Sequence, residues 1–218
     1  MRGLRKGQQC AIGRHQRSVE TPGSRRDDPV HGVGQRRSRN LTGVHGDRRR
    51  EFGKTSIQAR LQKNVHLISL KGQAMPLLAT DEWLTDARMT TGRGPTLLFF
   101  WAHWCADCKL FAKTLTAVQR EFGHRGLQVV APTQRYGYIG ARDHVAPAEE
   151  ARHIREIQRE FYPTLTGIPI PLSAKNFSAY GVSTTPTLVL VDRAGRVQRY
   201  QPGGMAASEL RQAIAALF

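Results

Sequence analysis

The sequence has few acidic residues, few cysteines and no long apolar run, and each shortage excludes a class of protein. It holds 33 Lys and Arg against 17 Asp and Glu, a formal net charge of +16 at pH 7. No window approaches the roughly 18 apolar residues that indicate a membrane-spanning helix. Three cysteines in 218 residues cannot form a framework of structural disulfides. We therefore expect a chain without a transmembrane segment, long enough to fold around a sizeable apolar core.

The basic excess lies mainly at the front of the chain. Residues 1–60 hold 15 of the 33 Lys and Arg but only 5 of the 17 Asp and Glu, and their few apolar residues follow no regular spacing. Such a segment cannot bury enough surface to offset the entropy lost on ordering. We predict that residues 1–64 are a disordered basic tail, or result from a start codon assigned too far upstream. Residues 65–218 then form the folded domain.

The front of the chain carries no complete export signal as written. Residues 1–6 are charged like the start of a signal peptide, and Arg49 and Arg50 resemble a twin-arginine signal, but neither is followed by an apolar stretch. A basic tail could contact nucleic acid or anionic lipid by releasing counterions. We favour a solvated tail with no specific nucleic-acid partner, and we interpret Cys10, which lies in it, as incidental.

Strand and helix patterns alternate in the rest of the chain. Residues 96–102 are continuously apolar, which is typical of a strand buried on both faces, and residues 127–132 form a second such run. Between the two runs the apolar residues recur at helical spacing as far as Gly123. They are Phe111, Leu115, Val118 and Phe122. Because a helix connects the two strands, we expect the strands to be parallel.

The remaining segments have shorter patterns. We expect an extended segment at 65–70, a helical turn at 81–84, a loop at 136–145, an edge segment with two prolines at 168–172 and a hairpin over 188–200. A helix should begin at Pro147, where proline suits the first position, and end before Pro163. Ser173 and Ser208 are predicted N-caps of two further helices. The fold class is therefore α/β.

Two cysteines stand between the first apolar strand and its helix. Cys105 and Cys108 are three positions apart, so on a first helical turn they can close a small disulfide ring, and the helix dipole stabilises the thiolate of the first. Cys105 would be the attacking thiolate, and Cys108 the resolving thiol that releases the reduced partner. Such exchange needs no metal or organic cofactor besides the redox-active disulfide itself.

Taken together, these segments resemble the thioredoxin superfamily and, more narrowly, the TlpA/ResA-like thiol-disulfide oxidoreductases. The resemblance rests on residues 100–109 around the two cysteines, on 181–187 and on 191–195. It implies a thioredoxin-like fold, a central mixed sheet flanked by helices, with an inserted helical segment at about 133–172. It also implies a cis peptide bond before Pro186. By the same resemblance, the residues around the dithiol that meet substrate are Trp104, Ala106, Asp107, Thr185 and Pro186.

The resemblance implies partners and a location as well. Substrates would be protein disulfides or dithiols, and an upstream donor would supply electrons, so the protein would act in cell redox homeostasis. The implied location is periplasm-like and extracytoplasmic, and the alternative location is cytoplasmic. We expect a monomer. Because the negative charge of Asp107 opposes thiolate formation at Cys105, we expect a reductant rather than an oxidant. The alternative function is a non-catalytic thioredoxin-like binding module whose basic tail contacts nucleic acid or membrane.

Other roles for the two cysteines fit less well. A structural zinc site commonly has four ligands in two close pairs, whereas His103, Cys105 and Cys108 supply three at most. Peroxiredoxin-like sites place Thr or Ser three residues before the reactive cysteine, where this chain has Ala102. Two unrelated core cysteines would not come with the rest of this pattern.

The chain departs from the family pattern at two acidic positions. The buried acid six residues before the first cysteine is here Phe99, and the Glu three residues after the second is Phe111. We expect Trp101 in the core and Trp104 at the rim of the site. His103 is expected to be a partly exposed neighbour rather than a catalytic base, and Asp107 either tunes the thiols or is simply a favourable first-turn carboxylate. The candidate replacements for a proton acceptor are Asp107, His103, Glu149 and Glu150.

Overall fold

The structure is a computed structural model and describes residues 60–61, 64–65, 69–90, 94–163 and 166–218. Nearly all of the predicted basic tail, residues 1–64, and half of the predicted extended segment at 65–70 lie outside these ranges. Where that segment is described, Val65 and Ser69 are helical, and the Ser69 hydroxyl donates to the Val65 carbonyl at 2.8 Å. The prediction of an extended conformation is therefore wrong at Val65 and Ser69, where the side chain of the second bonds to the carbonyl four residues before it.

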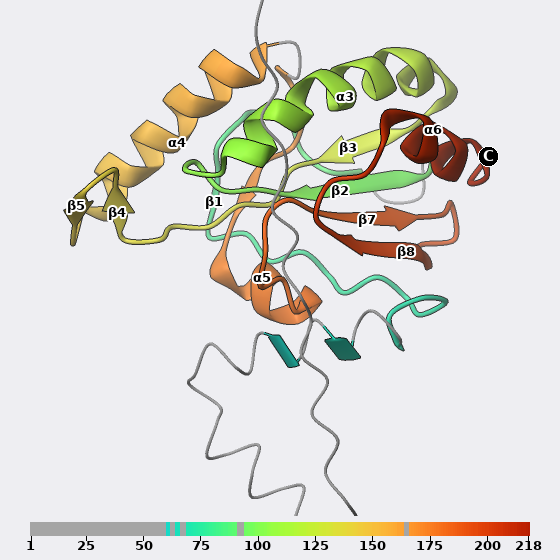
Figure 1. Ribbon diagram of the computed structural model, residues 1–218, viewed down its shortest axis with the longest axis horizontal. Coiled ribbons are helices and arrows are strands. Elements are labelled where there is room, and N and C mark those ends of the chain that lie inside the picture. Colours follow the sequence, from blue (N-terminus) through green and yellow to red (C-terminus); the bar gives the residue numbers. More distant parts are fainter. Residues whose placement is uncertain (1–59, 62–63, 66–68, 91–93, 164–165) are drawn as a thin grey trace, which may run out of the picture. The chain divides into compact units, whose positions relative to one another are not determined.

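A four-stranded mixed sheet lies at the centre of the fold (Figure 1). Its order is β3-β2-β7-β8, and the elements are β2 (Thr96–Phe100), β3 (Gln128–Val130), β7 (Thr187–Val191) and β8 (Val197–Pro202). β3 runs parallel to β2, as predicted, while β7 is antiparallel to both β2 and β8. Every residue of β2 and β7 is buried, which explains why these two strands are continuously apolar.

Helices cover both faces of this sheet. Figure 1 shows α3 (Ala106–Phe122) and α6 (Ala207–Ala215) along one face and α5 (Ala174–Tyr180) on the other. Alternate residues of β2 point to opposite faces, so Leu97 and Phe99 join one apolar cluster, while Leu98 and Phe100 join the second with α5. The predicted α/β thioredoxin-like architecture is confirmed.

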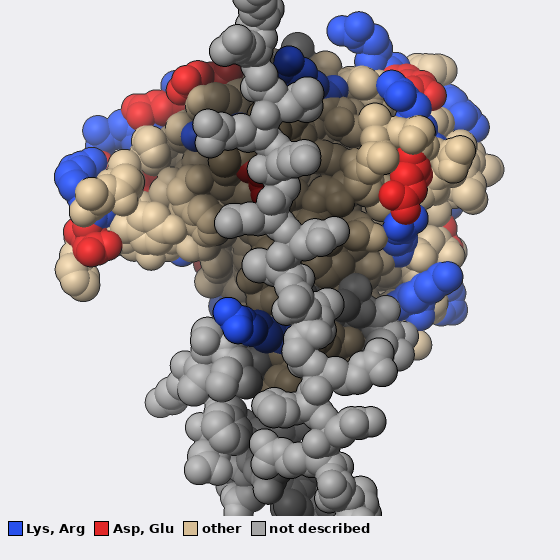
Figure 2. Space-filling model, viewed as in Figure 1, with Lys and Arg blue, Asp and Glu red and all other residues tan. Residues whose placement is uncertain are grey.

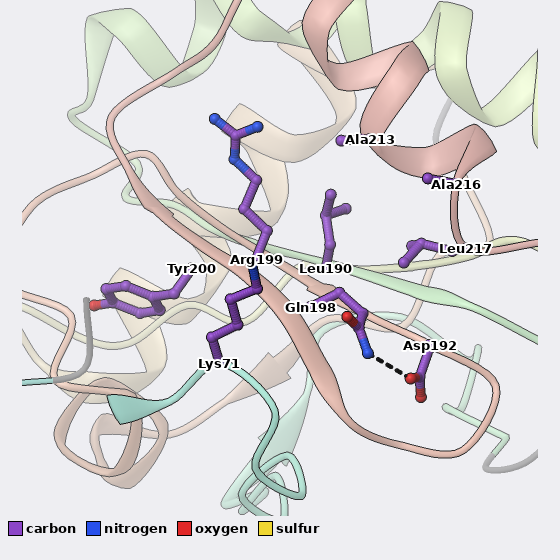
Figure 3. A pocket seen from close by; sticks show the side chains of 9 residues that line it. All are labelled: Lys71, Leu190, Asp192, Gln198, Arg199, Tyr200, Ala213, Ala216 and Leu217. Carbon is purple, nitrogen blue, oxygen red and sulfur yellow. Dashed lines mark hydrogen bonds between the residues drawn. The ribbon is translucent and has the colours of Figure 1, made fainter. Parts of the chain in front are cut away.

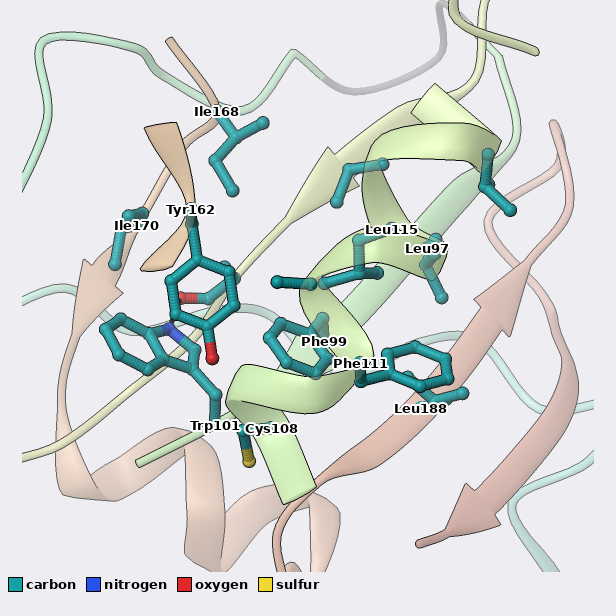
Figure 4. Close-up of a cluster of buried hydrophobic side chains, with 14 of the residues drawn as sticks. Leu97, Phe99, Trp101, Cys108, Phe111, Leu115, Tyr162, Ile168, Ile170 and Leu188 are labelled. Carbon is teal, nitrogen blue, oxygen red and sulfur yellow. Dashed lines mark hydrogen bonds between the residues drawn. The ribbon is translucent and has the colours of Figure 1, made fainter. Parts of the chain in front are cut away.

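The larger apolar cluster extends from α3 to the dithiol. Figure 4 shows Cys108 near the start of α3, with Phe111 and Leu115 further along the helix. The ring of Phe111 stacks on Phe99 with centroids 5.9 Å apart. Trp101 follows β2 and is buried, and its indole N–H donates to the Ala131 carbonyl at 3.1 Å. The start of the helix is therefore fixed by packing on the strand that precedes it.

The segment predicted as an insertion, residues 133–172, contains three short strands and a helix. They are β4 (Tyr138–Ile139), β5 (Arg142–Asp143), α4 (Pro147–Phe161) and β6 (Pro171–Leu172). The predicted loop at 136–145 thus includes a small hairpin, and Gly140, with φ of +60°, supplies the left-handed conformation that its two-residue turn needs. α4 begins at Pro147 as predicted. The prediction of an edge segment at 168–172 is wrong, because this segment pairs with Glu82–Trp83 on one side and with residues 131–133 on the other. The carbonyls of Pro169 and Pro171 accept the N–H groups of Ala131 and Thr133, so the N–H that each proline lacks is not needed there.

The predicted helical turn at 81–84 is wrong, since Glu82–Trp83 form strand β1, antiparallel to β6. Two backbone hydrogen bonds flank this strand. The N–H of Asp81 donates to the Leu172 carbonyl, and the N–H of Leu84 donates to the Ile170 carbonyl. The Glu82 carboxylate also pairs with two arginines of the 133–172 segment. Long-range pairing therefore overrides the local pattern.

Helix ends follow the sequence at α5 but not at α6. The Ser173 hydroxyl accepts the Lys175 N–H at 3.4 Å, and Gly181 ends α5 with φ of +61°. α6 begins two residues earlier than predicted, with Ala206 as N-cap, and Ser208 lies inside its first turn without capping it. Packing sets this start, because it places Leu210 and Ile214 in the core. Among the described helices, none combines the length and apolarity that crossing a membrane requires.

Candidate active site

The dithiol sits where β2 ends and α3 begins. The N–H of Cys105 donates to the Ala102 carbonyl at 3.1 Å, which closes a turn, and Cys105 is then the N-cap of α3 in an extended conformation. Its sulfur accepts the N–H of Cys108 at 3.1 Å. Cys105 and Cys108 form a disulfide with their Cα atoms 5.3 Å apart. The strand, turn and helix thus hold both sulfurs at a helix N-terminus, where the helix dipole favours a thiolate.

Exposure differs between the residues of this turn. Cys108 is fully buried and Cys105 is 3% exposed, whereas Trp104 is 47% exposed. Ala106 and Asp107 are also exposed, and Asp107 is the acidic residue of the first turn of α3. Trp104 therefore forms a rim beside the dithiol, as predicted, and Cys105 is the more exposed of the two cysteines.

A cleft of about 210 Å³ opens next to Trp104. Its lining residues come from four separate stretches of chain: Trp104, Gln134, Tyr136, Phe177, Val182, Ser183, Thr184 and Thr185. The structure therefore brings the predicted site residues Trp104 and Thr185 to one cleft, together with Tyr136 of the 133–172 segment, which the sequence did not single out. The rings of Tyr136 and Trp104 meet edge to face with centroids 5.4 Å apart.

The Thr185–Pro186 peptide bond is cis, and Pro186 is buried beneath the cleft-lining residues that precede it. The carbonyl of Pro186 accepts the N–H of Gly203 at 2.8 Å, which ties this loop to the end of β8. The hydroxyl of Thr185 is buried and has no hydrogen-bond partner within the described part of the chain. A bound polar group would offer that hydroxyl a partner.

His103 and Glu150 form a buried pair close to the dithiol. His103 is 2% exposed and Glu150 is 1% exposed, with Nε2 of the imidazole 3.4 Å from Oε1 of the carboxylate. The same carboxylate accepts the N–H of Tyr136 at 2.6 Å and that of Gly137 at 2.9 Å. The expectation of a partly exposed His103 is wrong, because the 133–172 segment folds over it.

The surroundings of His103 disfavour its charged form. Burial is the main cause that lowers the pKa of His103, and charge repulsion from His153 and Lys109 lowers it further, while Glu150 acts in the opposite direction. Three rings pack against the imidazole, with centroids 5.3 Å away for His153 and 5.7 Å for both Tyr136 and Tyr138. His103 is therefore neutral near neutral pH when the cysteines form their disulfide.

The four candidate proton acceptors differ in burial. Asp107 is exposed on the first turn of α3, and Glu149 is at the surface, where it pairs with Arg142 at 2.8 Å. Only His103 and Glu150 are buried. A signal for Glu150 was present in the sequence, since it lies four residues before Ile154 and so shares the apolar face of α4.

A larger hollow of about 720 Å³ lies between the β7–β8 hairpin and α6 (Figure 3). None of the predicted site residues lines it. Three of its polar side chains are paired: Gln198 donates to Asp192 at 2.7 Å, and Arg199 pairs with Glu209 at 2.5 Å. We assign this hollow no part in the chemistry.

Comparisons with known proteins agree with this geometry. Residues 84–218, more than half of the chain, match the family model of a thioredoxin-like domain. The chain is 26% identical over 129 residues to the thiol-disulfide oxidoreductase ResA of Geobacillus thermodenitrificans, which covers 59% of this chain and 64% of that protein. It is 37% identical over 46 residues to a thioredoxin-like protein of Synechocystis, or 19% of this chain and 42% of that protein. The chain thus spans less than two thirds of each curated relative.

Among solved structures, one similar chain is a protein of Chlorobium tepidum described as a thiol:disulfide interchange protein DsbE. It superposes with a TM-score of 0.52 at 24% sequence identity, over 67% of this chain and 96% of that chain. At this level of identity the likeness supports the fold.

Proposed function

Since the chain belongs to the thioredoxin-like domain family, we propose that it is a thiol-disulfide oxidoreductase that exchanges its Cys105–Cys108 pair with protein disulfides. The observation that carries this proposal is the position of the pair. The disulfide lies at the N-terminus of α3, next to a cleft that contains Trp104 and the residue before Pro186. The resemblance to TlpA/ResA-like proteins, read from the sequence, is consistent with the ResA relative.

The exchange follows from the two thiols of the reduced protein. The Cys105 thiolate attacks one sulfur of a substrate disulfide, a mixed disulfide forms and the other substrate sulfur leaves as a thiolate. Cys108 then loses its proton and attacks Cys105, which restores the Cys105–Cys108 disulfide and releases the second substrate thiol. Two electrons pass to the substrate in each cycle, and a donor dithiol returns them.

We favour the reducing direction because of Asp107. Its carboxylate lies between the two cysteines in the sequence, and an adjacent negative charge makes a thiolate less favourable. A less favourable thiolate makes the dithiol hold its electrons less tightly, so that it reduces other disulfides more readily. Protein disulfides as substrates, a dithiol electron donor, a monomeric state and an extracytoplasmic location remain parts of this proposal.

A trapping experiment tests the exchange. All variants are made with Cys10→Ser, so that the remaining thiols are those of the site. In Cys108→Ser the mixed disulfide on Cys105 cannot be resolved, and we expect it to accumulate with a model protein such as insulin, seen by non-reducing mass spectrometry. Cys105→Ser is the matched control and should trap far less. Equal trapping by both variants, or none by either, would reject the exchange at Cys105.

The charge of the chain favours one second candidate, a non-catalytic binding module that acts through its basic tail. Residues 1–60 carry most of the +16 charge, but most of them lie outside the described residues. On the face drawn in Figure 2, charges of both signs are mixed over α4 and around α6 and β8. This candidate predicts salt-dependent binding to nucleic acid or anionic vesicles that survives loss of both Cys105 and Cys108. Insulin reduction that needs both cysteines would count against it.

A further inference from the structure

The buried pair of His103 and Glu150 has no part in the exchange steps above. His103 lies in the turn closed by Ala102 and Cys105. Because consecutive Cα atoms are 3.8 Å apart, its Cα lies within about 7.6 Å of that of Cys105. Nε2 of His103 faces Glu150 at 3.4 Å and makes no hydrogen bond to any described residue. A buried titratable ring, two residues before the reactive cysteine, can thus still accept a proton.

Glu150 is held in place independently of the histidine. Its carboxylate accepts two backbone N–H groups, from Tyr136 and Gly137, so it stays at this position whether or not His103 carries a proton. The other groups that face the imidazole are His153 of α4, Lys109 of α3 and the rings of Tyr136 and Tyr138. Glu150 is the only negative charge among them, and it makes the direct contact.

We propose that His103, held against Glu150, takes up a proton when the Cys105–Cys108 disulfide is reduced, and so stabilises the Cys105 thiolate. Both are positioning residues for the exchange, and the inference rests on the proposed function. In the reduction, a donor dithiol is oxidised to a disulfide and supplies two electrons and two protons. The Cys105–Cys108 bond breaks, one proton binds the sulfur of Cys108, the other binds His103, and Cys105 is left as a thiolate.

Simple electrostatics gives the reason. In the disulfide form, burial keeps the imidazole neutral. Reduction adds a negative charge on Cys105, and in poorly hydrated surroundings a negative charge on a neighbouring side chain favours the protonated form of a histidine. Glu150 stabilises the imidazolium more than it opposes the thiolate, because it contacts the ring directly. Without His103, the Glu150 charge alone would oppose the thiolate, so the two residues act only as a pair.

The pair supplies the buried acid that the sequence lacks at the two family positions. Phe99 and Phe111 occupy the two positions where the family pattern has acids, and both are buried in the apolar core. The 133–172 segment supplies a carboxylate from another direction, through α4. An attacking thiol works best when its pKa is near the ambient pH, so the pair would raise the rate of attack, while Asp107 bears on the direction of electron transfer.

The test is the pH dependence of Cys105 alkylation by iodoacetamide in the reduced Cys10→Ser protein, with the modified peptide identified by mass spectrometry. We expect His103→Gln to react about tenfold more slowly below the midpoint of its profile, the equivalent of one pKa unit. Glu150→Gln should shift the profile in the same direction by less. The matched controls are His124→Gln, at an exposed histidine, and Glu149→Gln, next to Glu150 but at the surface. Both should follow the unsubstituted protein.

A second measurement needs no substitution in the pair. The imidazole resonances of His103, followed by NMR against pH, should give a higher pKa in the reduced protein than in the disulfide form. An equal pKa in both states, or coincident alkylation profiles for His103→Gln and the unsubstituted protein, would overturn the inference. If the protein still exchanges with insulin in that case, only this inference fails. If it exchanges with no protein disulfide at all, the proposed function fails first.

Discussion

The β2–α3 unit and the 133–172 segment place their polar groups differently. In the first, the strand is entirely buried and apolar, and the reactive groups stand at the boundary between strand and helix. In the second, a carboxylate lies on the buried face of α4, where two backbone N–H groups and His103 surround it. In the proposed exchange, the first unit supplies the reacting atoms and the second controls their surroundings. Predictions about the two regions should therefore differ in kind as well as in size.

The largest effect is expected at the boundary of the first unit. Cys105→Ser removes the attacking sulfur, so insulin reduction should fall to the rate seen without the protein. Cys10→Ser, which changes the one cysteine outside the site, should keep full activity. Activity that survives in Cys105→Ser would mean that the reacting atom lies elsewhere and that the boundary between β2 and α3 does not supply it.

Stability should respond strongly in both regions, because each contributes a buried side chain to the same apolar cluster. Phe99 of β2 and Ile154 of α4 are both buried, at 1% and 0% exposure. Truncation of a buried Phe to Ala typically costs about 3–5 kcal/mol and that of a buried Ile about 2–5 kcal/mol. We expect Phe99→Ala to lower the free energy of unfolding in urea by more than Ile154→Ala. The reverse order would show that the 133–172 segment, rather than the central sheet, dominates stability.

Two variants of Glu150 separate the effect of its charge on stability from the effect of its hydrogen bonds. Glu150→Ala leaves the N–H groups of Tyr136 and Gly137 without their acceptor, and an unsatisfied buried group costs about 1–3 kcal/mol. Glu150→Gln keeps one oxygen and should lose less stability, although it loses the same charge. Equal losses of unfolding free energy in the two variants would mean that the carboxylate does not anchor this loop by hydrogen bonding.

The smallest effect is a change in the pH dependence of stability. Because the folded state lowers the pKa of His103, the unfolded chain binds the proton more readily, and stability must fall as the pH drops below the ordinary value of 6.5. His103→Gln removes this contribution, so its melting temperature should fall less between neutral and mildly acidic pH. His124→Gln, at the surface, is the control. Parallel curves for all three proteins would contradict the assigned burial effect.

The sequence predicted most of the first unit and little of the second. Continuous apolar runs and the helical stripe of Phe111 and Leu115 identify β2, β3 and α3 because burial there coincides with apolarity. The strand at Glu82–Trp83 was missed because its pairing partner is Pro171–Leu172, far along the chain. His103 was placed at the surface for a similar reason: nothing local reveals that α4 will cover it.

The site shows the same division. Cys105, Cys108 and their position at a helix start follow from spacing alone, and the motif with Pro186 follows from the family resemblance. Tyr136 had no such signal, because it enters the cleft only through the path of its loop, which Glu150 fixes from α4. Residues placed by long-range contacts are those that a single sequence does not reveal.

The reduction potential of the Cys105–Cys108 pair tests the central claim most directly. It is measured by equilibrating the Cys10→Ser protein with dithiol and disulfide buffers and quantifying the free thiols. We expect a value near that of thioredoxin, about −270 mV, and well below the roughly −120 mV of a strong oxidant. A value near −120 mV would contradict the reducing direction. A value below about −300 mV, with no exchange on insulin, would indicate a structural disulfide and contradict the account as a whole.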